Sequence, residues 1–431
     1  MNWIFLGIIL VAFVSAAYRQ FRFEPIEGEA SPMEDLSAGM IQAAGGAVEL
    51  AIGLVGVMTL FLGLMKVAEA GGMLTIIAKL IRPLMTRLFP EVPPDHPAMG
   101  AMILNMSANA LGLGNAATPF GIRAMQELDK LNTRPGTATN AMALFLAINT
   151  SSITLLPTGV IAIRAAAGSL EPAAILPTTL FATVCATLAA IVAATLYRRL
   201  FPLGPKDPDA EKMERPWVEK DEGEALPSES SEAYPVWISG LALACLLAVI
   251  PLTVIYGRVI APWIIPVLIT GFLLFGAIRR VRIYEVFVDG AKEGFQVALR
   301  IIPYLVAILV AVGMFRASGA MDAVVGTVGG FTGRFGLPAE ALTMALMRPL
   351  SGSGAYGVMA SIINDPAIGP DSYIGYLVST LQGSTETTFY VLAVYFGAVQ
   401  VRRIRHTLAA SLTADVVAVI AAVAICTYLF L

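Results

Sequence analysis

Long apolar runs recur from one end of the chain to the other, and they limit the fold more than any other feature. Each run is close to the roughly 20 residues that a helix needs to cross the hydrocarbon core of a bilayer. Only 14% of the 431 residues are charged, whereas soluble domains carry about a quarter. We therefore predict an all-α polytopic membrane protein with about nine spanning helices, at residues 2–18, 45–65, 138–163, 173–197, 236–256, 259–278, 296–314, 373–400 and 408–431.

Composition excludes several functions. The net charge is −3 and no basic block is long enough to neutralise a row of phosphates, so nucleic-acid binding has no support. Cys185, Cys245 and Cys426 each lie inside an apolar run, as buried hydrophobes do. His96 and His406 are the two histidines, and no C-x-x-C, H-E-x-x-H or Walker-type sequence occurs. We expect no metal site, no cofactor and no ATP hydrolysis.

Two apolar stretches are too rich in Gly, Asn, Ser and Pro to form uninterrupted spanning helices. Residues 99–125 contain NMSANALGLGNAATPFG, and residues 339–363 contain MRPLSGSGAYG. Irregular backbone at membrane depth persists only where protein or a water-filled cavity satisfies its polar groups. Both stretches are predicted to be re-entrant helical hairpins.

A stretch rich in Pro, Glu and Ser divides the chain. It cannot bury apolar area and predicts a disordered acidic linker. The predicted organisation is a membrane half at 1–201, the linker at 202–235, and a second membrane half at 236–431.

The two halves share the order of their features. INTSSITLLP, from residue 148, occupies the place of QGSTETTFYV, from residue 382. Each half then holds a span, an interfacial helix, a hairpin, a polar-centred span and a last span. Three crossings in each unit, with a helix pair between the units, predict two repeats of opposite orientation, as in many transporters.

The distribution of Lys and Arg agrees with this topology, because short cytoplasmic loops hold the excess of both. Placing Met1 inside puts most basic residues inside as well, while Arg316, Arg334 and Arg348 are exceptions. The topology predicts a cytoplasmic N-terminus.

Two segments carry a resemblance to known proteins. NMSANALGLGNAATPFGIRAMQELDKLN, at 105–132, resembles the spore maturation protein A family, and residues 348–399 resemble the spore maturation protein B family. Both families carry the nucleoside-recognition, or Gate, domain, which also occurs in concentrative nucleoside transporters and ferrous-iron transporters. The resemblance implies a fusion of A-like and B-like halves, each with one Gate-like repeat, in a bacterial inner membrane. It does not fix a substrate.

Polar side chains concentrate at matching places in both halves and form the candidate binding site. Amides and hydroxyls donate and accept hydrogen bonds without the cost of a buried charge, which suits a small polar solute. The alternative is that small and hydroxyl residues only pack helices together. The candidates are Asn105, Asn109, Asn149, Thr150, Ser151, Ser353, Gln382, Ser384, Thr385 and Glu386.

Glu386 is the most specific candidate, because a carboxylate in an apolar span usually faces a partner or water and can bind a proton or cation. Its alternative is a salt bridge to Arg348 or Arg316. Asp415 also lies in an apolar run, but its sequence neighbours are apolar, so we interpret it as a helix-contact or boundary charge.

Three functions remain. The first is a secondary transporter or exchanger of a nucleoside, nucleobase or related metabolite, with H⁺ or Na⁺ as coupling ion. The second is a membrane scaffold or regulatory protein, in envelope or spore maturation, that keeps the fold without transport. The third, an intramembrane enzyme, is disfavoured, because no nucleophile and base can be placed together and no catalytic residue is identified. Homo-oligomerisation is left open.

Overall fold

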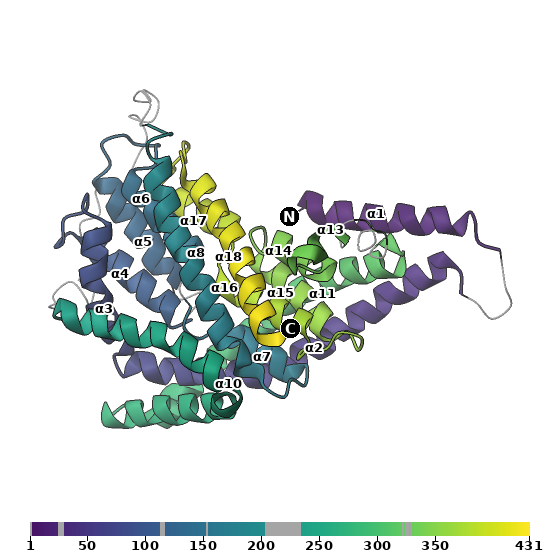
Figure 1. Ribbon diagram of the computed structural model, residues 1–431, viewed down its shortest axis with the longest axis horizontal. Helices are drawn as coiled ribbons and strands as arrows, with labels where there is room; N and C mark the ends of the chain where they lie inside the picture. The colour runs from purple at the N-terminus through teal and green to yellow at the C-terminus, as the bar shows by residue number, and fades with distance from the viewer. Residues whose placement is uncertain are drawn as a thin grey trace.

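The computed structural model describes residues 2–24, 30–112, 117–151, 154–202, 234–320 and 330–431, together with 323 and 327. Every regular element in this part of the chain is a helix (Figure 1). The predicted all-α fold class is confirmed. The predicted linker lies almost entirely outside the described residues, so the domain boundaries remain a prediction.

Two long helices lie side by side and run in opposite directions. They are α2 (Pro32–Ala70) and α11 (Ile283–Ala317), and both extend well beyond the predicted spans. Gly39 lies against Ala317, while Gly63 lies against Phe287 near the other end. Small residues let helix backbones approach closely in a membrane. α1 (Asn2–Gln20) packs against the same pair, where the Ser15 hydroxyl donates to the Ser318 carbonyl at 3.0 Å.

The predicted interfacial helix is α3 (Met73–Leu88). It turns by 69° from the last part of α2. Gly72 makes this turn with a φ of +84°, a conformation that costs glycine little. Lys79, Arg82 and Arg87 give α3 its polar side.

Both predicted hairpins are present as pairs of short helices. The first consists of α4 (Pro97–Ala110) and α5 (Ala117–Lys130), with its tip at 113–116 outside the described residues. The second consists of α14 (Ala339–Met347) and α15 (Gly352–Ile363). The Ser351 hydroxyl accepts from the Gly354 N–H at 3.0 Å and caps α15.

Both polar-centred spans are broken, whereas the sequence predicted uninterrupted helices. The first is α6 (Asn140–Ser151) followed by α7 (Thr158–Ala166), and the second is α16 (Tyr373–Ser384) followed by α17 (Thr388–Ala398). Pro157 helps to interrupt the first, because proline has no N–H to continue a helix. Thr385 is extended in the second, with φ −138° and ψ 168°.

The two broken spans run antiparallel, which establishes the inverted relation of the repeats. At one end, before α6, the Ala138 N–H donates to the Arg403 carbonyl, beyond α17, at 3.0 Å. At the other end, Arg164 of α7 donates to the Pro370 carbonyl, just before α16, at 2.7 Å. Each repeat thus begins its broken span where the other repeat ends.

The last helices of the repeats are α8 (Leu176–Tyr197), preceded by η2 (Pro172–Ile175), and α18 (Thr407–Phe430). Tyr197 hydrogen bonds to Thr413 at 3.2 Å, and Thr178 and Cys426 both contact Thr380, so α8 and α18 are also antiparallel.

The helix pair predicted between the repeats is a single helical segment, α10 (Val236–Ile278), of 43 residues. A straight helix of this length would span about 64 Å. However, Tyr234, which precedes the segment, donates its N–H to the Lys79 carbonyl, and Arg279, which follows it, donates to the Gly71 carbonyl. Both ends of the segment therefore lie near the start of α3, so the segment doubles back. Short turns α13 (Gly330–Thr332) and η4 (Gly333–Phe335) follow α11.

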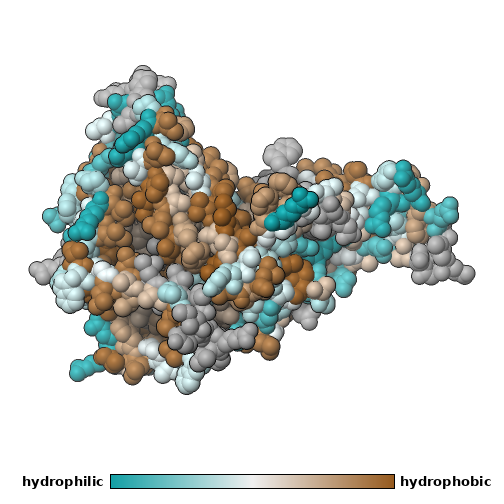
Figure 2. Space-filling model, in the orientation of Figure 1, coloured by the Kyte–Doolittle hydropathy of each residue, from teal (hydrophilic) through white to brown (hydrophobic). Residues whose placement is uncertain are grey.

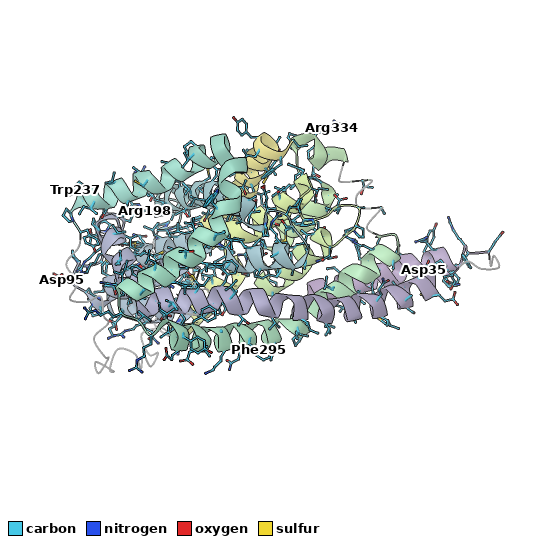
Figure 3. The ribbon with its side chains drawn as sticks, turned by 90° about the horizontal axis from the view of Figure 1, so that it is seen from below. Asp35, Asp95, Arg198, Trp237, Phe295 and Arg334 are labelled. Carbon is cyan, nitrogen blue, oxygen red and sulfur yellow. The ribbon has the colours of Figure 1, made fainter. Side chains whose placement is uncertain are left out.

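The surface is that of a membrane protein. Hydrophobic residues cover most of the visible face over α8 and α18, and hydrophilic ones gather at its upper edge and at the far end of α1 and α2 (Figure 2). Two described helices are long and apolar enough to span by themselves, Pro172–Tyr197 and Thr407–Phe430. The bent pair of Thr59–Ala70 and Met73–Leu88 passes the same test only when both parts are counted as one span. Asp95 and Arg198 lie at the opposite end of the molecule from Asp35 (Figure 3).

Candidate functional site

The breaks in the two antiparallel spans meet at the centre of the repeats. The Glu386 N–H, in the second break, donates to the Thr150 carbonyl, at the end of α6, at 2.8 Å. Each break is also tied to the hairpin of its own repeat: Leu155 N–H donates to Ala110 at 2.9 Å, and Phe389 N–H donates to Pro349 at 3.0 Å. Two hairpins and two broken helices therefore meet at one place. The sequence predicted that their polar side chains form one site, but not these contacts between their backbones.

Asn109 and Asn149 connect the first hairpin to the first break. The Asn109 amide donates to Asn149 Oδ1 at 3.0 Å, and the Asn149 amide donates to the Phe145 carbonyl of its own helix. Asn149 is 2% exposed. This neutral pair can exchange its hydrogen bond for one to a polar solute without moving a charge.

Asn105 connects the two repeats. Its Nδ2 donates to the Ala117 carbonyl at 2.8 Å and to the Tyr395 hydroxyl of α17 at 3.3 Å. Its Oδ1 is buried and has no hydrogen-bond partner among the described residues. An acceptor of this kind marks a place where a donor group can gain free energy by binding.

Three of the candidate hydroxyls serve their own helices. Thr150 donates to Ala147, Ser151 to Ile148 and Ser384 to Leu381, all within one turn. Their side chains thus follow the packing alternative. Backbone groups beside them do reach outward, because the Ser151 carbonyl accepts from the Thr183 hydroxyl at 2.8 Å.

Arg348, at the tip of the second hairpin, holds the second break. Its Nε donates to the Gln382 carbonyl at 3.1 Å, one Nη donates to the Thr387 hydroxyl at 3.0 Å, and the other contacts the Thr385 carbonyl. The last carbonyls of a helix lack internal donors and carry the negative end of its dipole. A buried guanidinium satisfies both needs.

Glu386 lies beside Arg348, with 3.8 Å between the charged atoms, and its side chain is 42% exposed. Of the two partners proposed from the sequence, Arg316 instead binds Asp365 at 2.6 Å. The ion pair between Glu386 and Arg348 is weak, because the guanidinium N–H groups donate to two backbone carbonyls and to the Thr387 hydroxyl. The Glu386 carboxylate is therefore available to a cation or to a donor group of a solute.

The remaining candidates lie on the second hairpin and α16. Gln382 is 2% exposed, and its Oε1 has no hydrogen-bond partner among the described residues. Ser353 is half-buried in the first turn of α15. Tyr356, one turn further on, closely approaches Gly159 of α7, where a Cβ would come within 2.7 Å of its hydroxyl.

The sequence missed or undervalued several residues of this centre. Arg348 was considered only as a salt-bridge partner of Glu386, and Asp415 was interpreted as a helix-contact or boundary charge and not as part of the site. Asp415 accepts from the Thr388 hydroxyl at 2.7 Å, directly after the second break. Tyr395 carried no signal, because one tyrosine in an apolar helix resembles any core aromatic. The described residues contain no group of three His, Cys, Asp or Glu side chains that could hold a metal ion.

The family comparison covers the same parts of both repeats. The sequence model described as Gate, nucleoside recognition, matches residues 51–167 and 298–402, just over half of the chain. Each matched segment runs from the first long helix of a repeat through its hairpin and its broken span.

Two relatives come from Bacillus subtilis. Spore maturation protein B is 48% identical over 166 residues, which are 38% of this chain and 92% of that protein. Spore maturation protein A is 45% identical over 160 residues, which are 37% of this chain and 82% of that protein.

Two further likenesses are weaker. The Escherichia coli inner membrane protein YjiG is 32% identical over 90 residues, 21% of this chain and 59% of that protein. The crystal structure of the Alcanivorax borkumensis YdaH transporter aligns over 98% of this chain and 96% of its own, at 15% identity and a TM-score of 0.36. By the family match and the two Bacillus relatives, the chain belongs to the Gate nucleoside-recognition family of membrane proteins, with a sequence resembling spore maturation proteins A and B joined in one polypeptide.

Proposed function

We propose that this protein is a secondary transporter or exchanger of a small polar solute, which binds where the two helix breaks cross. The observation that carries the proposal is the hydrogen bond between the Glu386 N–H and the Thr150 carbonyl, which joins broken spans of opposite orientation. Discontinuous helices at the interface of inverted repeats form the substrate sites of many secondary transporters.

The chemistry of the centre favours a solute with both donors and acceptors. Asn105 Oδ1 and Gln382 Oε1 are buried acceptors without partners among the described residues, and Asn109 and Asn149 offer exchangeable amides. Nucleosides and nucleobases have matching groups, and the family description names nucleoside recognition. No covalent step is required, so we propose a non-enzymatic function, in the bacterial inner membrane with the N-terminus in the cytoplasm.

A ligand screen tests this proposal. Purified protein in detergent is heated with nucleosides, nucleobases, amino acids or small organic acids, since a ligand that binds the native state raises the melting temperature. Each hit is then tested as a radiolabelled solute for uptake into proteoliposomes. We expect a nucleoside or nucleobase to stabilise the protein and to accumulate.

Asn149→Ala is the site variant for this screen, and Asn364→Ala is its matched control. The amide of Asn364 bonds to Ala360 four residues earlier, as the amide of Asn149 bonds to Phe145, but Asn364 ends α15 away from the breaks. The hit should be lost in Asn149→Ala and kept in Asn364→Ala. Equal loss in both variants would contradict a site at the crossing.

A scaffold function is the second candidate, favoured by the names of the two Bacillus relatives. If no solute shifts the melting temperature, and if stable membrane partners co-purify with the protein, the scaffold replaces the transporter. The Asn149→Ala variant would then leave partner binding unchanged.

A further inference from the structure

A narrow cavity lies beside the second break, between the second hairpin, α16 and α18. Its empty volume is about 230 Å³, including an open mouth. Four polar residues line it, among otherwise apolar neighbours: Arg348, Ser384, Thr385 and Asp415. The cavity therefore places a carboxylate of the last helix next to the residues that hold the break.

Asp415 is buried with half of its carboxylate unsatisfied. The residue is 7% exposed, and its Oδ2 accepts from the Thr388 hydroxyl at 2.7 Å. Its Oδ1 is buried and has no hydrogen-bond partner in the part of the chain that the structure describes. A buried carboxylate with one donor pays a large desolvation cost, which a proton on the second oxygen removes.

Arg348 acts on this carboxylate without forming an ion pair with it. It lines the same cavity, but its donors are engaged with Gln382, Thr385 and Thr387, and its ion pair is with Glu386. Among the described residues, no ion pair joins Arg348 to Asp415. A single guanidinium thus lies between two carboxylates, one of them partly exposed and the other buried.

A proton fits this site better than a metal cation. A proton needs one acceptor atom, which Oδ1 supplies, whereas hard metal ions take several oxygen ligands at once. The guanidinium that lines the cavity also repels a metal ion.

We propose that Asp415 binds and releases a proton during transport and that Arg348 links its charge to the second break. The inference rests on the proposed transport function, for which it names the coupling ion. The proton reaches Oδ1 from water at the cavity mouth and returns there. When Asp415 is charged, it competes with Glu386 for Arg348, which loosens the contacts between Arg348 and the second break.

Other titratable groups near α18 lie on the helices packed against it. α6 has none, and Arg348 with Glu386 form the only charged pair next to the cavity among the described residues. The others are tyrosines, cysteines and a histidine: Cys185 and Tyr197 on α8, Tyr373 and Tyr376 on α16, Tyr390 and Tyr395 on α17, Cys426 and Tyr428 on α18 itself, and His406 directly before α18.

Carbodiimide labelling tests the proposal without any knowledge of the solute. Dicyclohexylcarbodiimide reacts with protonated carboxyl groups in apolar surroundings, and peptide mass spectrometry locates the adduct on the full-length protein in liposomes. We expect an adduct on Asp415 that decreases about tenfold per pH unit above its midpoint, as for a single titrating group. Asp415→Asn should lose this adduct, whereas Asp365→Asn, which removes the partner of Arg316, should retain it.

A second pair of variants tests the link to Arg348. Arg348→Gln removes the neighbouring positive charge, so the labelling profile should move to higher pH, and Arg348→Lys should stay near the wild-type profile. An unchanged profile in Arg348→Gln would overturn the link.

Three results would overturn the proton site itself. They are no adduct on Asp415 at any pH, an adduct that does not vary with pH, and protection by sodium chloride but not by choline chloride, which would assign Na⁺ instead. Failure of the solute screen with a pH-dependent adduct would reject transport and leave the proton site intact.

Discussion

The two helix breaks occupy equivalent places in the repeats but are stabilised by different chemistry. In the second repeat, the end of α16 is held by a cation from its own hairpin, because Arg348 binds the carbonyls of Gln382 and Thr385. In the first repeat, the end of α6 is held by neutral groups from elsewhere: the Thr183 hydroxyl on Ser151, and the Glu386 N–H on Thr150.

This difference makes the first break dependent on the second. The carbonyls at the end of α16 are satisfied within their own repeat, since the hairpin supplies Arg348. The first break takes one of its donors from the second break, so a disturbance there should spread to α6. Breaking the second repeat should therefore cost more than breaking the first.

The largest effect is expected from Arg348→Ala. It leaves the carbonyls of Gln382 and Thr385 buried without their charged donor, which should lower the free energy of unfolding by about 3 kcal/mol. Unfolding in mixed detergent micelles, followed by tryptophan fluorescence, measures the change. Arg334→Ala, at an exposed position in the same repeat, is the control and should stay within about 0.5 kcal/mol of wild type.

The second repeat should also respond to acid. His406 is fully buried just before α18. Its burial is the main cause that lowers its pKa to about 4, and the positive charges of Arg405 and Arg198 are a smaller one. His406 has a pKa of 6.5 in the unfolded chain and of about 4 in the native protein. Between these two pH values the unfolded chain binds the proton more strongly, so the free energy of unfolding should fall as pH decreases from 6.5 to 4. We expect a loss on the order of 2 kcal/mol, measured by unfolding at several pH values.

His406→Asn should flatten this acid-dependent loss of stability. A variant with the same slope between pH 6.5 and 4 as wild type would place the sensitive group elsewhere.

The neutral pair of the first repeat should contribute less than Arg348. A double-mutant cycle with Asn109→Ala and Asn149→Ala should give a coupling energy of about 1 kcal/mol, as for one uncharged hydrogen bond. The same unfolding assay measures it. A coupling as large as the Arg348→Ala effect would remove the contrast between the breaks.

The smallest effect on stability is expected from Glu386→Gln. Its side chain is 42% exposed and lies 3.8 Å from the guanidinium, so the change should be below about 0.5 kcal/mol. If Glu386 contacts the solute, affinity should fall by about tenfold in the same variant, which isothermal titration with the identified ligand would detect. Large destabilisation with unchanged affinity would make Glu386 a structural residue.

The features that the sequence predicted correctly are those with a local signal. Hairpins follow from Gly, Ser and Asn in apolar stretches, such as the segments around Asn105 and Ser353, and the inverted repeat follows from the shared order of features. The breaks after Ser151 and Ser384 were missed, because Ser and Thr within an apolar run fit a helix as well as a break. The carbonyls at these breaks accept hydrogen bonds from residues far along the chain, such as Thr183, Glu386 and Arg348, and no local sequence pattern reveals such partners.

The sequence by itself determined that this chain is an all-α membrane protein of two related, oppositely oriented halves, because apolar length and charge distribution depend only on residue order. The tertiary structure decided which polar residues act together. In it, the hydroxyls of Thr150 and Ser384 donate to carbonyls of their own helices, and Asp415 lines the same cavity as Arg348. The physical reason is that a buried polar group must find its partner in three dimensions, and that partner is often hundreds of residues away or in the other repeat.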